Sequence, residues 1–148
     1  MSSAPAPSSL TDLLFGIVAS ALMASLGLLQ YGETRIRVEA AAVAGELRMV
    51  AEAAIAYEAS TGDWPPDGRR GEVPNGLAPF LGAVEFAGRR RVLEWDRFGI
   101  TDPGDDPIAG VTLRAADRRL LGSVIADMAG EYPYFVAGNQ VTWLLPGG

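Results

Sequence analysis

Two acidic residues, Glu94 and Asp96, are the best candidates for catalytic chemistry in this sequence of 148 residues. They are two positions apart, so on a β-strand they would share one face, and a pair of carboxylates can act as a general acid and base. No nucleophile is recognisable beside them. The sequence contains no cysteine and no histidine, which removes the usual thiolate nucleophile and the commonest general base and metal ligand. These absences favour a protein that is not an enzyme, with no cofactor and no small-molecule substrate.

A second acidic cluster, Asp102, Asp105 and Asp106, could suggest a calcium-binding loop. Pro103 and Pro107 bracket this cluster, and the segment TDPGDDP does not match the ligand spacing of an EF-hand. The sequence therefore predicts a solvated turn here, and it predicts no metal site.

The basic residues show one local run, Arg89-Arg90-Arg91, which is interpreted as the polar start of a strand or as a contact for an acidic partner or a lipid headgroup. All twelve basic residues are arginine, they are scattered, and the formal net charge is −6. A nucleic-acid-binding protein needs a cationic face to neutralise phosphates. We therefore expect no nucleic-acid partner.

An uncharged, mostly apolar run extends from Leu13 to Gly32. Twenty helical residues rise about 30 Å, which is the thickness of the hydrocarbon core of a bilayer. A buried core helix would show a polar stripe, and a signal peptide would begin with basic residues, whereas MSSAPAPSS has none. The sequence therefore predicts a flexible N-terminus over residues 1–9 and a transmembrane helix over residues 10–32.

Small residues recur along one face of this predicted helix, at Gly16, Ser20, Ala24 and Gly27. Small side chains allow the backbones of two helices to approach closely in lipid, which favours helix–helix packing. Glycine, alanine and serine are also simply frequent in membrane helices. We expect membrane lipid and other transmembrane helices, of the same chain or of a larger complex, as partners.

Asp12 stands at the start of the apolar run. One interpretation is that its carboxylate lies in the first helical turn, where the helix dipole favours a negative charge, with Ser9 as the N-cap. The other interpretation is an intermolecular contact with a cation on a neighbouring subunit. The sequence does not separate the two.

After the predicted span, an alanine-rich segment carries a helical apolar stripe made by Ile36, Val43, Leu47, Val50, Ala54 and Tyr57. No proline occurs between Pro7 and Pro65, so we expect one continuous helix of about fifty residues. Residues 33–61 would form its emergent, amphipathic part, which ends before Gly62.

The remaining residues, 62–148, read as a globular head. Alternating apolar positions predict strands, and Asp117 predicts the N-cap of one additional helix. The predicted strands cover residues 90–100, 110–115, 134–136 and 141–145. The fold class is therefore α+β, with the long N-terminal helix packed against a small antiparallel sheet.

Taken together, these features resemble type IV pilins and, more closely, the pseudopilins of the general secretion pathway. SSLTDLLFG is similar to the family's N-terminal motif, with Asp12 in the place of a glutamate. LRMVAEAAIAYEASTGDWPPD with VPNGLAPFLG is similar to the end of the family's helix, and VTLRAADRRLLGSVIADMAGEY with NQVTWLL resembles its closing strand–helix–strand segment. The resemblance implies a non-enzymatic, membrane-anchored subunit of a secretion or fimbrial filament, in which Asp12 would help to register one subunit against the next.

The sequence departs from the family in its N-terminal region, where Pro7 precedes Ser8 and no prepilin-peptidase site is apparent. This departure favours an alternative function, a single-span accessory subunit of a larger membrane complex, such as a secretion, photosynthetic or respiratory machine. Arg35 and Arg37 follow the span, and by the positive-inside rule alone they would place the head in the cytoplasm. The resemblance outweighs this bias, so we expect a single-pass protein of the bacterial inner membrane with its head in the periplasm.

Overall fold

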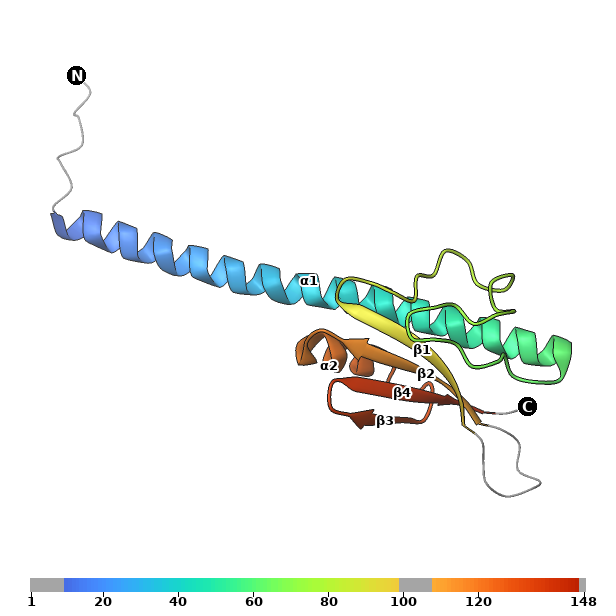
Figure 1. The fold of residues 1–148 in the computed structure, drawn as a ribbon. Coiled ribbons are helices and arrows are strands. Elements are labelled where there is room, and N and C mark those ends of the chain that lie inside the picture. Colours follow the sequence, from blue (N-terminus) through green and yellow to red (C-terminus); the bar gives the residue numbers. More distant parts are fainter. Residues whose placement is uncertain (1–9, 99–107, 147–148) are drawn as a thin grey trace. The chain divides into compact units, whose positions relative to one another are not determined.

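The computed structural model describes residues 10–98 and 108–146, with the element order α1, β1, β2, α2, β3, β4 (Figure 1). The chain divides into two compact units, one ending at Arg35 and one beginning at Ile36. Helix α1 (Leu10–Thr61) contributes residues to both units, and the sheet and the second helix belong to the second unit. The predicted α+β class, with one long N-terminal helix, one additional helix and a small antiparallel sheet, is confirmed.

Helix α1 is continuous over 52 residues, as the absence of proline predicts. It ends where Gly62 adopts a φ of +77°, a left-handed conformation that glycine reaches without a steric penalty. The Gly62 N–H donates to the Glu58 carbonyl at 2.8 Å and so satisfies one of the last carbonyls of the helix. Pro65 and Pro66 follow and prevent the helix from resuming.

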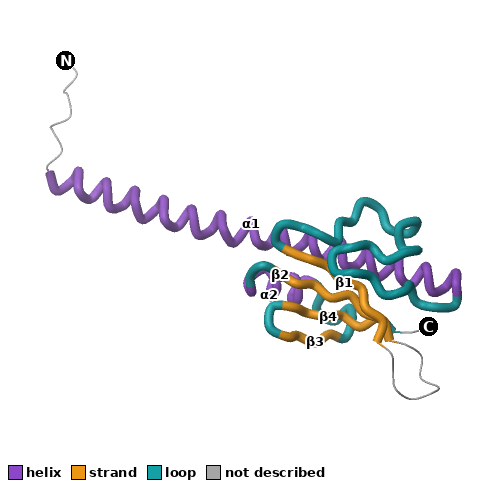
Figure 2. The backbone as a smooth tube through the Cα atoms, viewed as in Figure 1, coloured by secondary structure: helices purple, strands orange, loops and turns teal. Residues whose placement is uncertain are grey.

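The four strands form one antiparallel sheet in the order β1-β2-β4-β3 (Figure 2). Their bounds are Arg91–Phe98 for β1, Ile108–Ala115 for β2, Tyr134–Ala137 for β3 and Gln140–Leu145 for β4. The register pairs Leu93 with Leu113 and Val111 with Trp143, so these apolar side chains share one face of the sheet.

This face of the sheet, the part of α1 in the second unit and helix α2 (Arg118–Asp127) form one hydrophobic core. Its largest fully buried side chains include Trp95 and Trp143 from the sheet and Leu47 from α1. The stripe predicted on the emergent helix is confirmed at its centre, because Val43, Leu47, Val50 and Ala54 are all buried. Alanines separate these residues along the buried stripe, so large and small side chains alternate on the face of the helix that enters the core.

Three arginine–glutamate ion pairs attach α1 to the rest of the second unit: Arg90–Glu39, Arg91–Glu46 and Arg48–Glu131. In the last pair, Arg48 Nε lies 3.0 and 2.9 Å from the two Glu131 carboxylate oxygens, and Nη2 also donates to the Asp127 carbonyl at 2.9 Å. The pKa of Glu131 is lowered by this hydrogen bonding to Arg48. The pairs fix where along α1 the sheet and α2 pack.

The segment after α1 covers the free edge of β1. Gly71 N–H donates to the Leu93 carbonyl at 2.9 Å, and Leu93 N–H donates to the Phe86 carbonyl at 2.8 Å. Within the same segment, residues 77–81 form a single turn, closed by a 3.0 Å bond from Leu81 N–H to the Leu77 carbonyl. Backbone groups that would otherwise form an open sheet edge are thereby satisfied.

Helix α2 begins at the predicted N-cap. The Asp117 backbone is extended, and Asp117 Oδ1 accepts from the Leu120 N–H at 2.8 Å. Asp117 Oδ2 accepts from Arg90 Nη2 at 2.5 Å. The Leu120 hydrogen bond is the main cause of a lowered Asp117 pKa, so this stabilisation is present above the carboxyl's ordinary pKa and is lost as the pH falls through the folded value.

We predict that Asp117→Ala destabilises the second unit by about 1–2 kcal/mol, because it removes the N-cap and the Arg90 ion pair together. Asp117→Asn keeps a side-chain oxygen that can cap the helix, so it should lower the free energy of unfolding clearly less than Asp117→Ala does. Unfolding of the full chain in mild detergent, followed by the near-ultraviolet circular dichroism of the buried tryptophans, measures both. The control is Glu72→Ala, because Glu72 is exposed and its side chain makes no hydrogen bond or ion pair among the described residues. Equal losses for the alanine and asparagine variants would show that the cap contributes nothing.

Candidate functional site

The apolar part of α1 in the first unit is the most unusual surface of the molecule. None of its described residues is buried, although most are large and apolar; Phe15 is 78% exposed and Leu29 is 67% exposed. Water-exposed apolar surface of this extent is unfavourable, and it marks a site for lipid or for another protein. Helix α1 is long enough and apolar enough to cross a membrane. Core helices of soluble proteins and signal sequences can meet the same two criteria. A core helix, however, would be mostly buried.

The predicted packing residues Gly16, Ser20, Ala24 and Gly27 all lie on this exposed helical surface. A Cβ added at Gly16 or Gly27 would meet no atom within 4 Å, so the space beside both glycines is open. Their spacing places the four residues within about a quarter of the helix circumference. The surface can therefore receive a second helix at close range, and assembly through it stays a prediction.

Asp12 lies in the first turn of α1, where the positive end of the helix dipole favours a carboxylate. It already takes part in an interaction within the chain. Ser9, its predicted capping neighbour, lies outside the described residues. The helix-start interpretation is compatible with this position, and the intermolecular contact stays a prediction.

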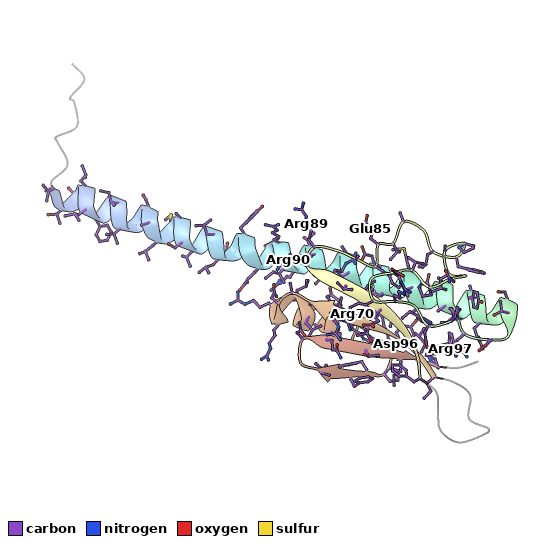
Figure 3. The ribbon with its side chains drawn as sticks, in the orientation of Figure 1. Arg70, Glu85, Arg89, Arg90, Asp96 and Arg97 are labelled. Atoms are coloured by element: carbon purple, nitrogen blue, oxygen red, sulfur yellow. The ribbon has the colours of Figure 1, made fainter. Side chains whose placement is uncertain are left out.

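The run Arg89-Arg90-Arg91 lies at the beginning of β1, and its members have different surroundings; Figure 3 labels Arg89 and Arg90. Arg90 donates from Nη1 to Glu39 at 2.6 Å and from Nη2 to Asp117 at 2.5 Å. Arg91 pairs with Glu46 and donates to the Glu85 carbonyl at 2.6 Å. Arg89 is exposed and has no ion-pair partner in the part of the chain that the structure describes. Of the three, Arg89 is the one whose charge is available to another molecule.

A hollow of about 220 Å³ lies beside this run, lined by Gly88, Arg89, Arg90, Arg91, Val92, Arg114, Ala115 and Ala116. Arg114 Nε is buried and makes no hydrogen bond within the described residues, and it forms a long ion pair with Glu94 Oε2 at 4.0 Å. The side-chain carbonyl of Gln140, the cross-strand neighbour of Arg114, is also buried without a partner. Of the arginines that line the hollow, Arg89 is the one without an ion-pair partner among the described residues.

Arg118 and Arg119 form the first turn of α2, and the sequence analysis did not single them out. Both are exposed, and within the described ranges neither has an ion-pair partner. Positive charge at the N-terminus of a helix opposes the dipole and costs roughly 0.3–1 kcal/mol per residue. Their position directly after the predicted N-cap Asp117 is the sequence signal that could have identified these two arginines.

The candidate carboxylate pair lies on the outer face of β1, with Glu94 and Asp96 on the same side as predicted. Arg70 Nε donates to Glu94 Oε2 at 3.1 Å. Burial raises the pKa of Asp96, and the negative charges of Glu94 and then Asp67 raise it further. Neither of the two hollows described for this chain, of about 220 and 290 Å³, is lined by Glu94 or Asp96.

The predicted solvated turn with Asp102, Asp105 and Asp106 lies outside the described residues. Among residues 10–98 and 108–146, no group of three or more acidic side chains is placed to hold a metal ion. The described part of the chain thus offers no candidate metal centre.

Comparisons of the chain with known protein families, with curated proteins and with solved structures each give no match.

We predict that Asp96→Asn stabilises the protein at pH 7, because it removes a carboxylate whose ionised form is disfavoured by burial and by neighbouring charges. A raised folded pKa means that the penalty exists only where the carboxyl is ionised. The difference between variant and wild type should therefore shrink as the pH falls below the ordinary aspartate range. Thermal unfolding of the full chain in detergent between pH 7 and pH 3 measures this difference.

The control is Glu85→Gln, at an exposed carboxylate, which should shift the unfolding midpoint little at any pH. A loss of stability in Asp96→Asn at pH 7 would contradict the prediction.

Proposed function

We propose that this chain is a single-span, membrane-anchored structural subunit that acts by helix–helix assembly in a filament of the pseudopilin type. The observation that carries the proposal is an apolar helical segment that is long enough to cross a bilayer and has no buried residue. Lipid and neighbouring helices are the surroundings that make such a surface stable.

The contrast within α1 supports this proposal. From Ala40 to Ala54 the helix buries a stripe of eight residues in the core of the second unit. Between Leu10 and Arg35 it buries none. A helix that only packs on the core of a soluble protein has a polar face along its whole length. The first part of α1, in contrast, has no charged residue from Leu13 to Gly32.

The order of elements also supports a pilin-like interpretation. A long N-terminal helix is followed by an irregular segment, by two strands, by one short helix and by a closing strand pair. The quoted motifs fall on these elements in the same order: the helix end at Thr61-Gly62, the strand β2, the helix α2 and the final strand β4. A pseudopilin-like subunit in this sense would be non-enzymatic and would have no small-molecule ligand.

We place the protein in the bacterial inner membrane, with the second unit in the periplasm. This location follows from the pilin-like interpretation, in which the globular part lies outside the cytoplasm. The alternative function, an accessory subunit of a larger membrane complex, shares the anchor and differs in its assembly: a filament subunit forms open polymers, whereas an accessory subunit has a fixed stoichiometry.

Assembly through the small-residue face can be tested with two identical substitutions. Ala24→Ile adds bulk on the face that carries Gly16 and Ser20, and Ala21→Ile adds the same bulk about 60° away around the helix from Ala24, outside this face. Both variants stay apolar, so both should enter the membrane. We expect Ala24→Ile to reduce the assembled fraction by about tenfold and Ala21→Ile to leave it nearly unchanged.

Size-exclusion chromatography in mild detergent, with crosslinking in native membranes, measures this difference. Polymers of variable length in the wild type support the filament function, and a complex of fixed composition supports the accessory subunit. If Ala24→Ile and Ala21→Ile assemble equally well, the small residues do not form the contact.

A further inference from the structure

Arginines without an ion-pair partner among the described residues gather at one end of the second unit, where β1 and α2 begin. Arg89 lies two residues before β1, and Arg118 and Arg119 form the first turn of α2. Arg90 joins these segments, because it follows Arg89 and donates at 2.5 Å to Asp117, the residue before Arg118. Figure 3 shows Arg89 and Arg90 together beside α1, away from Asp96 and Arg97 further along β1.

The same end of the unit contains the point where α1 enters it. Arg90 also donates to Glu39, the fourth residue of the second unit, at 2.6 Å. Arg37, two residues earlier, is exposed and has no ion-pair partner among the described residues. We call the set Arg37, Arg89, Arg90, Arg118 and Arg119 the basic end.

The basic end differs from the rest of the chain in its charge. It holds five arginines, against which stand the two carboxylates that Arg90 binds, Glu39 and Asp117. The whole chain, in contrast, has a formal net charge of −6. Positive charge is therefore concentrated at one end of the second unit of an acidic protein, where Arg118 and Arg119 oppose the dipole of α2.

The hollow of about 220 Å³ adjoins this end and is lined by four arginines, Arg89, Arg90, Arg91 and Arg114. Among the described residues Arg89 makes no ion pair, whereas the other three are paired with carboxylates, Arg114 at 4.0 Å from Glu94. The planar guanidinium group binds phosphate oxygens with two parallel hydrogen bonds, which makes arginine well suited to a phosphate ligand.

We propose that the basic end binds the phosphate groups of anionic phospholipids at the surface of the membrane, an inference that rests on the proposed membrane anchor. Gly32, the last residue of the uncharged run, precedes Arg37 by five residues, and five helical residues rise about 8 Å. The headgroup layer on each side of the hydrocarbon core is roughly as thick. Arginines beside the end of a membrane span are thus at the level of the lipid phosphates, where they attract anionic lipids.

The test uses the full chain in a neutral detergent, titrated with phosphatidylglycerol, with phosphatidylcholine and with inorganic phosphate, and bound molecules are counted by native mass spectrometry. We expect phosphatidylglycerol to bind at least about fivefold more tightly than phosphatidylcholine. Arg89→Gln should raise the dissociation constant for phosphatidylglycerol about fivefold. Arg69→Gln is the matched control, since Arg69 is also exposed and without an ion-pair partner in the described chain, but does not line the hollow.

Combining Arg89→Gln with Arg118→Gln and Arg119→Gln should weaken binding of phosphatidylglycerol about a hundredfold if the three charges act additively. None of the three side chains makes an ion pair within the described residues, and two of the charges oppose the dipole of α2, so the variant should unfold at or above the wild-type midpoint. An unchanged affinity in this folded triple variant would overturn the proposal.

Three other outcomes would also overturn it. Equal binding of phosphatidylglycerol and phosphatidylcholine would show that the headgroup charge is not recognised. Competition by inorganic phosphate at the lipid's own concentration would assign the site to free phosphate. Tighter binding of a polyglutamate peptide than of phosphatidylglycerol would assign it to an acidic protein.

Failure of the inference can be told apart from failure of the membrane anchor. A chain that needs detergent but shows no preference for phosphatidylglycerol keeps its anchor and lacks the lipid site. A chain that stays dispersed in water without detergent has no anchor, and the phosphate titration then reports on the basic end directly.

Discussion

The packing of α1 against one face of the sheet holds the second unit together. Ala40, Ala44, Leu47 and Val50 are fully buried in the core that also contains Trp95 and Trp143. The small alanines and the larger leucine and valine side chains between them together fill the helix side of this core. Three ion pairs at Glu39, Glu46 and Arg48 hold α1 in one position along its axis. Removal of α1 would leave this face of the sheet exposed to water.

This packing explains why the arginines of the second unit have separate roles. Arg90 and Arg91 are bound by carboxylates of α1 and α2, so their charges serve the fold. Arg89, Arg118 and Arg119 have no such partners among the described residues. The same chain segments thus provide both the internal connections and the charges that remain available at the surface.

Local sequence patterns were sufficient to predict the elements. The stripe from Val43 to Ala54 has helical spacing, Asp117 precedes a helix it caps, and alternation marks β1 and β2, so each prediction depends on residues close together in the chain. The bonds from Arg90 to Glu39 and Asp117 span 51 and 27 residues, and no local pattern reveals them. The strand order β1-β2-β4-β3 also depends on contacts between distant segments. For the same reason the run Arg89-Arg90-Arg91 reads as uniform in sequence, although its members have different partners in the structure.

The central claim is that the apolar part of α1 lies in lipid. The most direct measurement is extraction of the full chain from membranes with alkaline carbonate and then with detergent, followed by the intact mass of the recovered protein. The account predicts that carbonate leaves the protein in the membrane pellet, that mild detergent releases it, and that the recovered chain retains residues 10–32. Recovery in the carbonate supernatant, as a monodisperse protein that still contains those residues and needs no detergent, would contradict it.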